Sequence, residues 1–422
     1  MSIHADIVAD FRIPKMAKVR QVFPNDKIAD PAAELRRVVE QSGKLYNIKP
    51  GQSVAVAIGS RSLANGAIMY RELISMIKER GAFPFIFPAM GSHGGANAEG
   101  QKELLASLGV TEEFCGCPIR ATMETVEIGK TENKGISVNC DKFASEADAI
   151  VLMNRIKPHT SFRGPIESGL AKLTVIGVGK RKGADICHSF KMSNMSENIM
   201  EMADYFYRHM NVAFGVGVIE NAYDETNRIV CFGADEILEK EPACLRTAFT
   251  MMPQIYFRKY DILILDEMGK NISGPGMYCN VNSRYPTDDI PPDVRQSIVT
   301  VLDLTDESHG NAHGMGLADI STKRLFDKID FIPTYANPLT SLSKMLGKMP
   351  MIMESDKVAI QASIKLCSGD RSNPKIIRAK NTIQIGELLI SEALLDEASR
   401  MDNIDILSGP EYMEFDENGN LF

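Results

Sequence analysis

Three histidines and one lysine lie in glycine-rich or turn-rich segments of the first half of the chain. His93 lies within MGSHGGA, His159 follows a proline in KPHTSF, Lys172 ends SGLAK, and His188 follows a cysteine in ADICHS. The chain has only seven histidines, so three of them in such contexts indicate a built site. These residue types transfer protons, attack as nucleophiles or bind metals. The pattern therefore indicates a site for catalysis or metal binding.

His93 and His159 are candidate proton carriers. A neutral imidazole has a pKa of about 6.5, so it can accept and return a proton near pH 7. Glycines on both sides of His93 allow its ring to approach a substrate closely, and backbone N–H groups in such a loop can face an anion. The alternatives are a plain strand-to-helix turn at His93 and a surface loop at His159. A turn, however, does not need a histidine at its centre.

Lys172 and His188 are ambiguous when each is taken alone. The apolar run GLAKLTVI around Lys172 would remove water from its ammonium and favour the neutral, nucleophilic amine. The alternative is a lysine at a strand end whose stem lies along apolar surface. His188 and Cys187 are ligand types for zinc, nickel or copper, but two adjacent residues rarely bind one ion well. No C-x-x-C or H-E-x-x-H motif completes a zinc set.

Strands alternating with helices must position these residues, which favours an α/β fold with mainly parallel sheets. One predicted strand ends just before the His93 loop, and another ends just before the His159 segment. Open parallel sheets bind ligands at the carboxyl ends of their strands, so these loops are expected to face one shared cleft. The first half is predicted to contain strands at 53–58, 83–87, 149–153 and 212–219 and a helix at 64–78.

The length of 422 residues predicts two domains, since one hydrophobic core rarely serves so long a chain. We expect an N-terminal α/β domain at 1–250, with the histidines and Lys172, and a C-terminal α/β domain at 251–422. The second domain would supply loops to the substrate pocket, with the active-site cleft between the two. Its predicted strands, at 261–265 and 298–302, each lead into a polar segment.

Composition excludes several classes of protein. A net charge of −8 argues against nucleic acid as a partner, because binding phosphates would need an excess of basic residues. No apolar run approaches the roughly 20 residues needed to span a bilayer, so no membrane association is expected. The start of the chain is too polar for a secretory leader, and the eight cysteines are scattered. We expect reduced thiols in a cytoplasmic protein.

Over most of its length the chain resembles the nickel-dependent lactate racemases. That family uses a nickel-pincer nucleotide, pyridinium-3-thioamide-5-thiocarboxylic acid mononucleotide with bound nickel. The resemblance rests on S-H-G at His93, P-H at His159, SGLAK ending at Lys172, and His188 sixteen residues later. It implies that His93 and His159 are the catalytic bases. It also implies that Lys172 is joined to the cofactor through a thioamide and that His188 is the protein ligand of nickel.

The same resemblance implies a racemase or epimerase of a 2-hydroxy acid. Hydride would pass to the cofactor while a histidine takes the hydroxyl proton, and the resulting 2-keto acid could be reduced from either side. Arg61 resembles the family's arginine that holds anionic groups, and Lys270 is a second candidate cation for the substrate carboxylate. Nickel-pincer biosynthesis enzymes would be partners. The predicted cofactor-binding residues besides Lys172 are Ser60, Arg61, Ser62, Gly94 and Gly95.

Departures from the lactate enzymes concern the substrate pocket. The stretch between His159 and Lys172 is longer here and carries Arg163, Pro165 and Glu167. In the second domain, the tyrosine, glutamine and lysine cluster of the family has no match. A more polar, differently charged pocket suggests a dicarboxylic, polyhydroxylated or larger 2-hydroxy acid in place of lactate. The predicted substrate-binding residues are Arg163, Lys270, Asn271 and Arg284.

Two other functions remain open from the sequence. His309 and His313 are four residues apart and could bind the metal of a hydrolase if they were on a helix, with aspartates nearby. Three glycines within residues 308–316 make a helix there unfavourable. The other alternative is a ligand-binding or cofactor-carrier protein without turnover. A pair of candidate bases argues against it, because a binding protein has no use for them.

Overall fold

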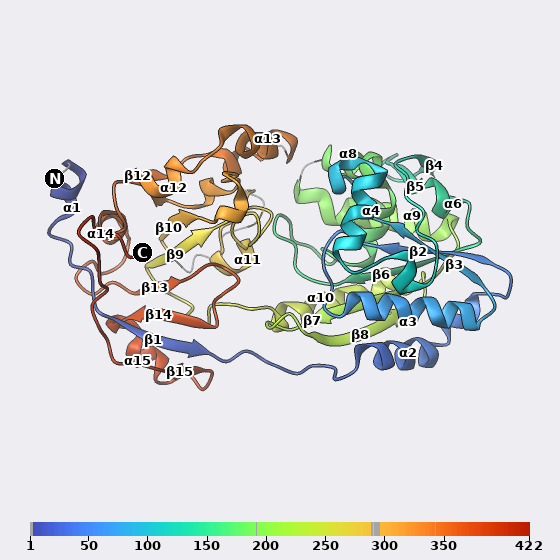
Figure 1. Ribbon diagram of the computed structural model, residues 1–422, viewed down its shortest axis with the longest axis horizontal. Coiled ribbons are helices and arrows are strands. Elements are labelled where there is room, and N and C mark those ends of the chain that lie inside the picture. The colour runs from blue at the N-terminus through green and yellow to red at the C-terminus, as the bar shows by residue number, and fades with distance from the viewer. Residues whose placement is uncertain (1–2, 191, 288–289, 291–295, 342) are drawn as a thin grey trace. The chain divides into compact units, whose positions relative to one another are not determined.

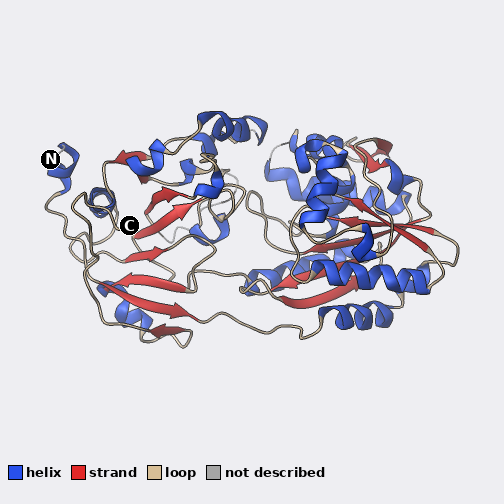
Figure 2. Cartoon of the chain, viewed as in Figure 1, coloured by secondary structure: helices blue, strands red, loops and turns tan. Residues whose placement is uncertain are grey.

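The computed structural model describes residues 3–190, 192–287, 290, 296–341 and 343–422. The chain forms two compact units, and each is described by itself. The first unit in chain order is Pro24–Met252, and the second combines Met1–Phe23 with Pro253–Phe422. Both units are mixed α/β structures with mainly parallel sheets, so the predicted fold class is confirmed (Figures 1 and 2).

The unit Pro24–Met252 is built on a five-stranded sheet. Four neighbouring strands of this sheet pair in parallel, and the fifth, at one edge, runs antiparallel to its neighbour. Parallel neighbours have their carboxyl ends at the same edge, which is the edge that binds ligands in such sheets. In spatial order the strands are β3 (Phe83–Pro88), β2 (Ser53–Ile58), β6 (Ala149–Arg155), β7 (Val212–Glu220) and β8 (Thr226–Phe232).

Side chains of β2 alternate between two buried cores, one on each face of the sheet. Val54, Val56 and Ile58 belong to the core covered by α2 (Pro31–Ser42) and α3 (Gly66–Glu79). Ala55 and Ala57 belong to the core on the opposite face, which includes residues of α9 (Met195–His209) and α10 (Ile237–Met251). Burial on both faces explains why this strand reads as a continuous apolar run.

Shorter elements complete this unit (Figure 1). The pair β4 and β5 is antiparallel and contains a bulge near Gly129. These elements are η1 (Lys44–Asn47), η2 (Gly94–Ala96), α4 (Ala98–Ser107), α5 (Glu112–Cys115), β4 (Thr125–Lys130), β5 (Ser137–Asp141), α6 (Lys142–Ser145), α7 (Leu170–Lys172), η3 (Leu173–Val178), α8 (Lys180–His188) and η4 (Met192–Asn194).

The other unit contains an eight-stranded sheet in the order β12-β11-β10-β9-β13-β14-β1-β15. The part from β12 to β13 is parallel, and the rest is antiparallel. Its strands are β1 (Met16–Gln21), β9 (Ile262–Met268), β10 (Ile298–Leu304), β11 (Ile320–Thr322), β12 (Met351–Met353), β13 (Ile376–Ala379), β14 (Glu387–Ser391) and β15 (Ile404–Ile406).

The first strand of the chain lies in this second sheet. Our sequence prediction placed residues 1–250 in one domain, but β1 pairs with both β14 and β15. The unit boundary therefore falls after Phe23 as well as after Met252. The helices of this unit are α1 (Ile3–Val8), α11 (Cys279–Asn282), η5 (Asp306–Ser308), η6 (Met315–Leu317), α12 (Lys323–Asp327), α13 (Phe331–Ser341), η7 (Lys344–Gly347), α14 (Asp356–Leu366), η8 (Glu392–Leu394) and α15 (Leu395–Ala398).

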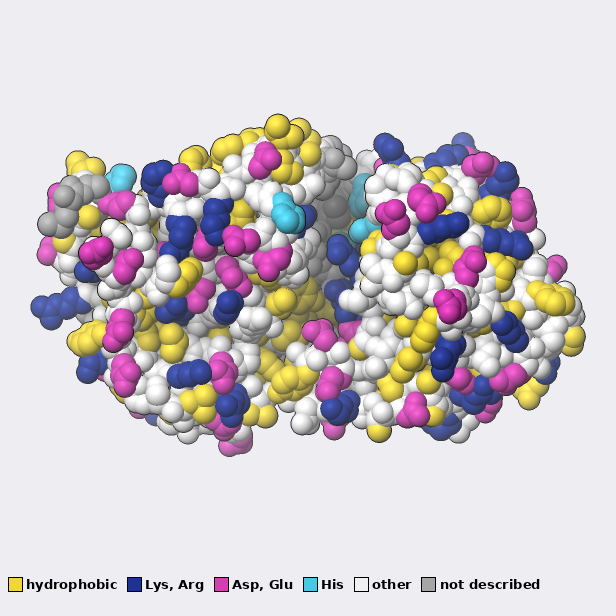
Figure 3. All heavy atoms as spheres, viewed as in Figure 1, with side chains coloured by type: hydrophobic (Ala, Val, Ile, Leu, Met, Phe, Trp, Pro, Cys, Tyr) yellow, Lys and Arg dark blue, Asp and Glu magenta, His cyan; other side chains and the backbone are white. Residues whose placement is uncertain are grey.

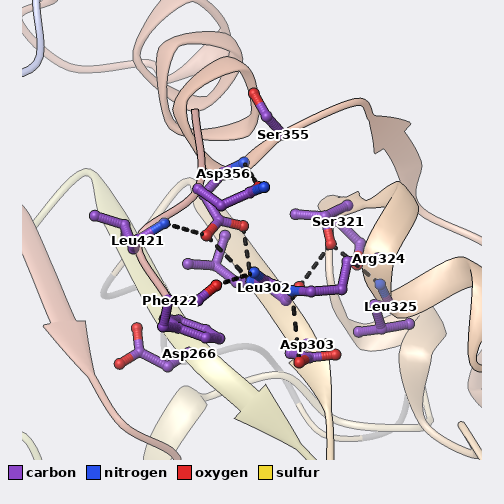
Figure 4. Close-up of polar contacts among 12 residues, drawn as sticks. Asp266, Leu302, Asp303, Ser321, Arg324, Leu325, Ser355, Asp356, Leu421 and Phe422 are labelled. Atoms are coloured by element: carbon purple, nitrogen blue, oxygen red, sulfur yellow. Dashed lines mark hydrogen bonds and ion pairs between the residues drawn. The ribbon is translucent and has the colours of Figure 1, made fainter. Parts of the chain in front are cut away.

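A buried carboxylate fixes the carboxyl-terminal segment of this unit (Figure 4). Asp356 is fully buried and accepts two hydrogen bonds from the guanidinium of Arg324, at 2.9 and 3.1 Å. The same carboxylate accepts the N–H of Leu421 at 2.8 Å, and Arg324 donates to the carbonyl of Phe422 at 2.7 Å. The final residues are therefore held against α12 and α14 by charge-assisted hydrogen bonds.

The charged side chains of the protein are of both signs, and its cysteines are unpaired thiols. On the face in Figure 3, acidic and basic side chains are interspersed over each unit. All eight cysteines carry free thiols, and only Cys231 is not fully buried. Among the residues that the structure describes, no helix has both the length and the apolar character needed to cross a bilayer.

A buried ammonium joins four elements of the unit Pro24–Met252. Lys180, the first residue of α8, is fully buried, and its Nζ lies 3.0 Å from Oδ2 of Asp141 at the end of β5. It also donates to the carbonyl of Pro88 and, at 3.1 Å, to Oε1 of Gln101 in α4. Gln101 in turn donates to the carbonyls of Gly91 and His93, at 3.1 and 3.2 Å. The His93 loop is thus linked to the start of the helix that ends at His188.

Replacing Lys180 by Met should destabilise this unit by about 3 kcal/mol, because it leaves Asp141 buried without its partner. The matched control is Lys182→Met, whose side chain is half exposed and only 3.8 Å from Glu127. That change should stay within about 0.5 kcal/mol. Urea unfolding followed by circular dichroism measures both variants. Equal unfolding midpoints for the two would contradict the role assigned to Lys180.

Candidate functional site

Three parallel strands deliver candidate residues to one edge of the sheet. Arg61 follows the end of β2 by three residues, His93 follows β3 by five, and His159 follows β6 by four. Because β2 pairs in parallel with both β3 and β6, the three loops emerge at the same edge. Arg61 shares its turn with Ser60, which is half-buried, and Ser62, which is exposed.

A short backbone pairing brings the His159 loop to the Lys172 segment. The N–H of Lys157 donates to the carbonyl of Ser168 at 2.9 Å, and the N–H of Ser168 donates back at 3.2 Å. Asn154, near the end of β6, donates to the carbonyl of Gly169 at 2.9 Å. These contacts close the loop that holds His159 and fix where α7 begins.

Lys172 lies in a helix and not at a strand end, which had been one alternative from the sequence. It ends the short helix α7, which runs on through the π-helix η3 into α8 and His188. Fully buried Glu241 of α10 accepts the N–H groups of Leu170 and Ala171, both at 3.1 Å. A Cβ at Gly169 would lie 1.8 Å from Oε1 of this carboxylate, so the close approach requires glycine.

The charge of Lys172 acts on all three candidate histidines. Loss of water around the rings is the main cause that lowers the pKa of His93, His159 and His188, and the nearby Lys172 lowers each of them further. Burial, aided by Arg61, lowers the pKa of Lys172 itself to about 8, although Cys187 opposes this effect. The four residues singled out by the sequence therefore form one electrostatically coupled cluster.

Lys157 is a member of this cluster that sequence reasoning missed. Burial lowers its pKa to about 7, and the cations of Arg155, Arg61 and Lys172 lower it further, while Glu220 opposes them. Glu220 forms an ion pair with Arg155. The available signal was position, since Lys157 stands between the end of β6 and His159. So many cations around neutral imidazoles suit a ligand with more than one negative charge.

The His159 loop is held by a buried carboxylate. The N–H of His159 donates to Oε2 of Glu167 at 2.6 Å, and the ring packs against Phe162 with centroids 4.3 Å apart. Nδ1 of His159 accepts the backbone N–H of Ser161 at 3.1 Å. Glu167 is only 1% exposed. Backbone and ring of His159 are therefore both fixed before any substrate arrives.

Arg163, predicted to bind substrate, has several partners within the same loop. Its Nη1 donates to the carbonyl of His159 at 2.6 Å and lies 3.3 Å from Glu167. The guanidinium also lies over the ring of Phe249, 5.5 Å from its centroid. These contacts hold the His159 loop. A role in substrate binding stays a prediction for Arg163.

The His93 loop needs glycines at two positions. Gly94 and Gly95 have φ values of 64° and 66°, and a Cβ at Gly94 would lie 2.7 Å from the carbonyl oxygen of Gly100. Nδ1 of the His93 ring lies 2.9 Å from the carbonyl oxygen of Met90. His93 itself is exposed at the sheet edge. Binding of a cofactor by Gly94 and Gly95 stays a prediction.

His188 has the chemistry of a single metal ligand. It is exposed at the end of α8. Partial burial and Lys172 lower its pKa, while the Ala184 backbone and Asp185 oppose them, and a neutral ring is the form that metals bind. Within the described residues, no three His, Cys, Asp or Glu side chains are placed to hold one ion.

Three predicted substrate-binding residues lie in the other unit, and each has partners there. Nζ of Lys270 donates to the carbonyl of Gly274 at 2.7 Å and to the side chain of Asn337 at 3.0 Å. The side-chain oxygen of Asn271 accepts from Thr305 at 2.7 Å. Arg284 forms an ion pair with Asp319 at 2.9 Å. Their contacts with a substrate stay predictions.

The His309 and His313 segment does not form a metal-binding helix. His309 is exposed with φ 47°, between the short helices η5 and η6. His313 is buried, which together with Lys270 lowers its pKa to about 4. The expectation that glycines prevent a helix there is met. The hydrolase alternative lacks the ligand spacing on which it depended.

Comparison with known proteins places this site in a family. Residues 8–200 match the family model described as the lactate racemase N-terminal domain. This part of the chain is therefore similar to the N-terminal domain of lactate racemases. The resemblance seen in the motifs is thereby confirmed, since the matched residues include His93, His159, Lys172 and His188. This similarity supports an isomerase of the racemase or epimerase type.

A solved structure extends the likeness in fold. The lactate racemase apoprotein from Thermoanaerobacterium thermosaccharolyticum matches with a TM-score of 0.55 and 12% sequence identity. The match covers 87% of this chain and 99% of that one. At this identity the likeness concerns the fold alone. No curated protein matches the chain.

The reactivity of Lys172 should rise at lower pH than that of an ordinary lysine. With its pKa lowered to about 8, half of the amine is neutral at that pH, so acetylation should reach half its maximal rate there. Lys142 is the internal control, because its ion pair with Glu124 raises its pKa. Competitive labelling at several pH values, read by peptide mass spectrometry, gives both profiles.

Arg61→Gln provides the matched variant for this measurement. Removing the guanidinium should move the Lys172 midpoint upward, because Arg61 helps to lower the pKa of that amine. The Lys142 profile should not change. If acetylation of Lys172 and Lys142 in the unmodified protein showed the same pH dependence, Lys172 would not have the lowered pKa assigned to it.

Proposed function

We propose that this protein is a racemase or epimerase of a 2-hydroxy acid that works with a nickel-pincer nucleotide attached to Lys172. The observation that carries the proposal is the coupling of Lys172 to three histidines on separate segments. An amine whose charge acts on three imidazoles offers an attachment point, a metal ligand and two groups for proton transfer. Similarity to the N-terminal domain of lactate racemases supports the same reaction type.

The residues present fit such a cofactor. An amine with a lowered pKa is the nucleophilic form needed to form a thioamide. His188 offers one ring nitrogen, and the described residues offer no further ligand set, so the remaining ligands of nickel would come from the nucleotide. Arg61 and Lys157 supply positive charge for a phosphate or carboxylate. When bound, the nucleotide would supply the acceptor and donor of hydride.

The side chains of this chain supply binding and proton transfer. A 2-hydroxy acid carries a carboxylate, for which Arg61 and Lys157 are the nearby cations. The hydroxyl proton must leave as the α-carbon becomes planar and must return when the alcohol is formed again. His93 and His159 are the candidate carriers, and lowered pKa values keep both rings neutral near pH 7.

The identity of the hydroxy acid stays a prediction. A substrate other than lactate is the prediction motivated by the charged residues Arg163, Lys270 and Arg284. The cationic cluster around Lys157 also favours an acid with a second anionic or strongly polar group. A carrier without turnover is the alternative, and neutral histidines at the attachment lysine argue against it.

Intact-mass spectrometry with metal analysis tests the cofactor. Protein produced together with nickel-pincer biosynthesis enzymes should carry added mass on Lys172 and bound nickel, and protein produced alone should carry neither. Lys172→Arg should abolish the adduct because arginine cannot form the thioamide. His188→Ala should keep the adduct and lose most of the nickel. An unmodified Lys172 in the co-produced protein would contradict the proposal.

Chiral chromatography over a panel of 2-hydroxy acids tests the reaction. The loaded protein should interconvert the stereoisomers of at least one dicarboxylic, polyhydroxylated or larger acid more efficiently than lactate. Turnover of lactate alone would rule out the proposed substrate class. Binding of these acids without any change in configuration would support the carrier.

A further inference from the structure

The side-chain amide of Gln101 in α4 holds the backbone of the His93 loop. Its Nε2 donates to the carbonyl of Gly91 at 3.1 Å and to the carbonyl of His93 at 3.2 Å. The polar side chain of Gln101 is fully buried. A buried polar group whose hydrogen bonds are made fixes one arrangement of the backbone around it. The two carbonyls flank Ser92, so one amide group fixes the turn that presents the His93 ring.

The ammonium of Lys180 determines which way this amide points. Nζ of Lys180 donates to Oε1 of Gln101 at 3.1 Å, and an ammonium can only donate hydrogen bonds. The amide oxygen must therefore face Lys180, which leaves Nε2 for the two loop carbonyls. Asp141 lies 3.0 Å from the ammonium, and both charged side chains are fully buried. We call the contacts of the Gln101 amide with the loop and with Lys180 the amide bridge.

The backbone of Lys180 is strained at the point where it supplies this ammonium. Lys180 stands at the junction of η3 and α8, and its φ is 54°, in the left-handed region that favours glycine. Both this conformation and the burial of the charge oppose folding. Backbone strain of this kind persists where the surrounding structure fixes it, and it gathers at functional sites. A need at the site therefore explains the place of the ammonium better than stability does.

The His93 loop also lies directly against η3. The N–H of Gly91 donates to the carbonyl of Gly177 in η3 at 3.3 Å. A Cβ at Gly177 would lie 2.5 Å from the carbonyl oxygen of Ala89, so the two segments touch backbone to backbone. The chain enters η3 directly from Lys172. The loop is thus attached to η3 by its own backbone and to the start of α8 by the amide bridge.

The composition of the His93 loop explains why it needs such contacts. Gly91, Gly94 and Gly95 all have positive φ values, of 57°, 64° and 66°. Glycine loses more conformational freedom on folding than any other residue, so a loop rich in glycine is costly to fix in one arrangement. Hydrogen bonds from outside the loop offset that cost. The buried amide of Gln101 supplies two of them.

We propose that Gln101 is a positioning residue for the His93 ring and that Lys180 orients it for this task. The amide bridge keeps the ring in a fixed place with respect to the helical run that carries Lys172. The inference rests on the proposed function, because it takes His93 as a proton carrier. Gln101 acts through the loop backbone and carries no proton itself. A displacement of about 1 Å in a reacting group can lower a rate about 100-fold.

Gln101→Met tests the amide bridge, because methionine has a similar length but makes none of these hydrogen bonds. Glu103→Met is the matched control, since it places the same side chain on the exposed face of α4. Hydrogen–deuterium exchange of the cofactor-free proteins, read by mass spectrometry on peptides that span residues 89–97, measures opening of the loop. Gln101→Met should speed this exchange about 10-fold or more and leave β2 and β6 unchanged. Glu103→Met should change neither.

Gln101→Glu separates the two sides of the amide bridge. A carboxylate still accepts from Lys180 but cannot donate to the loop carbonyls. Exchange in residues 89–97 should therefore rise as it does in Gln101→Met, although the contact with Lys180 is kept. Circular dichroism checks that each variant is folded. If Gln101→Met does not fold, Gln101→Glu decides alone.

Activity of the loaded protein tests the positioning role. Gln101→Met should lower kcat by about 10-fold or more and keep KM within about twofold, because the cations that bind the substrate stay while the proton carrier is displaced. Intact mass and metal analysis should show the same adduct on Lys172 and the same nickel content. In the His93→Gln background, Gln101→Met should cause no further loss of kcat, because no carrier is left to position.

The outcomes separate this inference from the proposed function. Unchanged exchange in residues 89–97 of Gln101→Met and Gln101→Glu would overturn the inference. An equal loss of kcat from Gln101→Met with and without the His93→Gln change would also overturn it, since the effect would not pass through His93. If loaded, unmodified protein converts no 2-hydroxy acid, the proposed function fails, and the exchange experiment still decides whether the amide bridge holds the loop.

Discussion

Parallel pairing of β2 with β3 on one side and β6 on the other is the constraint on which the site depends. It brings the loops after three strands to one edge of the sheet, so Arg61, His93 and His159 lie at the same edge although they are far apart in the chain. The strand ends alone do not place Lys172 and His188. The backbone pairing of Lys157 with Ser168 and the carboxylate of Glu241 fix the start of α7, and the continuous run through η3 and α8 carries the chain to His188.

The cluster so formed gathers basic side chains whose pKa values are lowered by partial burial and by one another. Burial and neighbouring cations act in the same direction on lysines and histidines, because both disfavour a further positive charge. They keep the imidazoles of His93, His159 and His188 neutral and make Lys172 a better nucleophile near neutral pH. A site of this kind is poorly suited to free cations and well suited to anionic ligands. The unfavourable crowding is tolerated because buried Glu241, Glu167 and the Lys180–Asp141 pair hold the surrounding backbone.

The sequence was sufficient for features that depend on local pattern. The apolar run of β2 predicted a buried strand with its bounds. Features that depend on distant contacts were not predictable. Nothing local to Met16–Gln21 shows that it pairs with β14, whose partner residues follow 367 to 375 positions later. Glu241 and Glu167 read as ordinary helix and loop carboxylates, and only the folded chain shows them buried against backbone N–H groups. Lys157 was overlooked because its function depends on what surrounds it.

Residue type also leaves the protonation of a histidine undetermined. Two imidazoles in similar glycine- or proline-containing loops look interchangeable in the sequence, and family resemblance reinforces that equivalence. Their difference arises from one backbone group each: a carbonyl at Met90 beside one ring and an N–H at Ser161 beside the other. Such contacts decide which ring nitrogen can accept a proton.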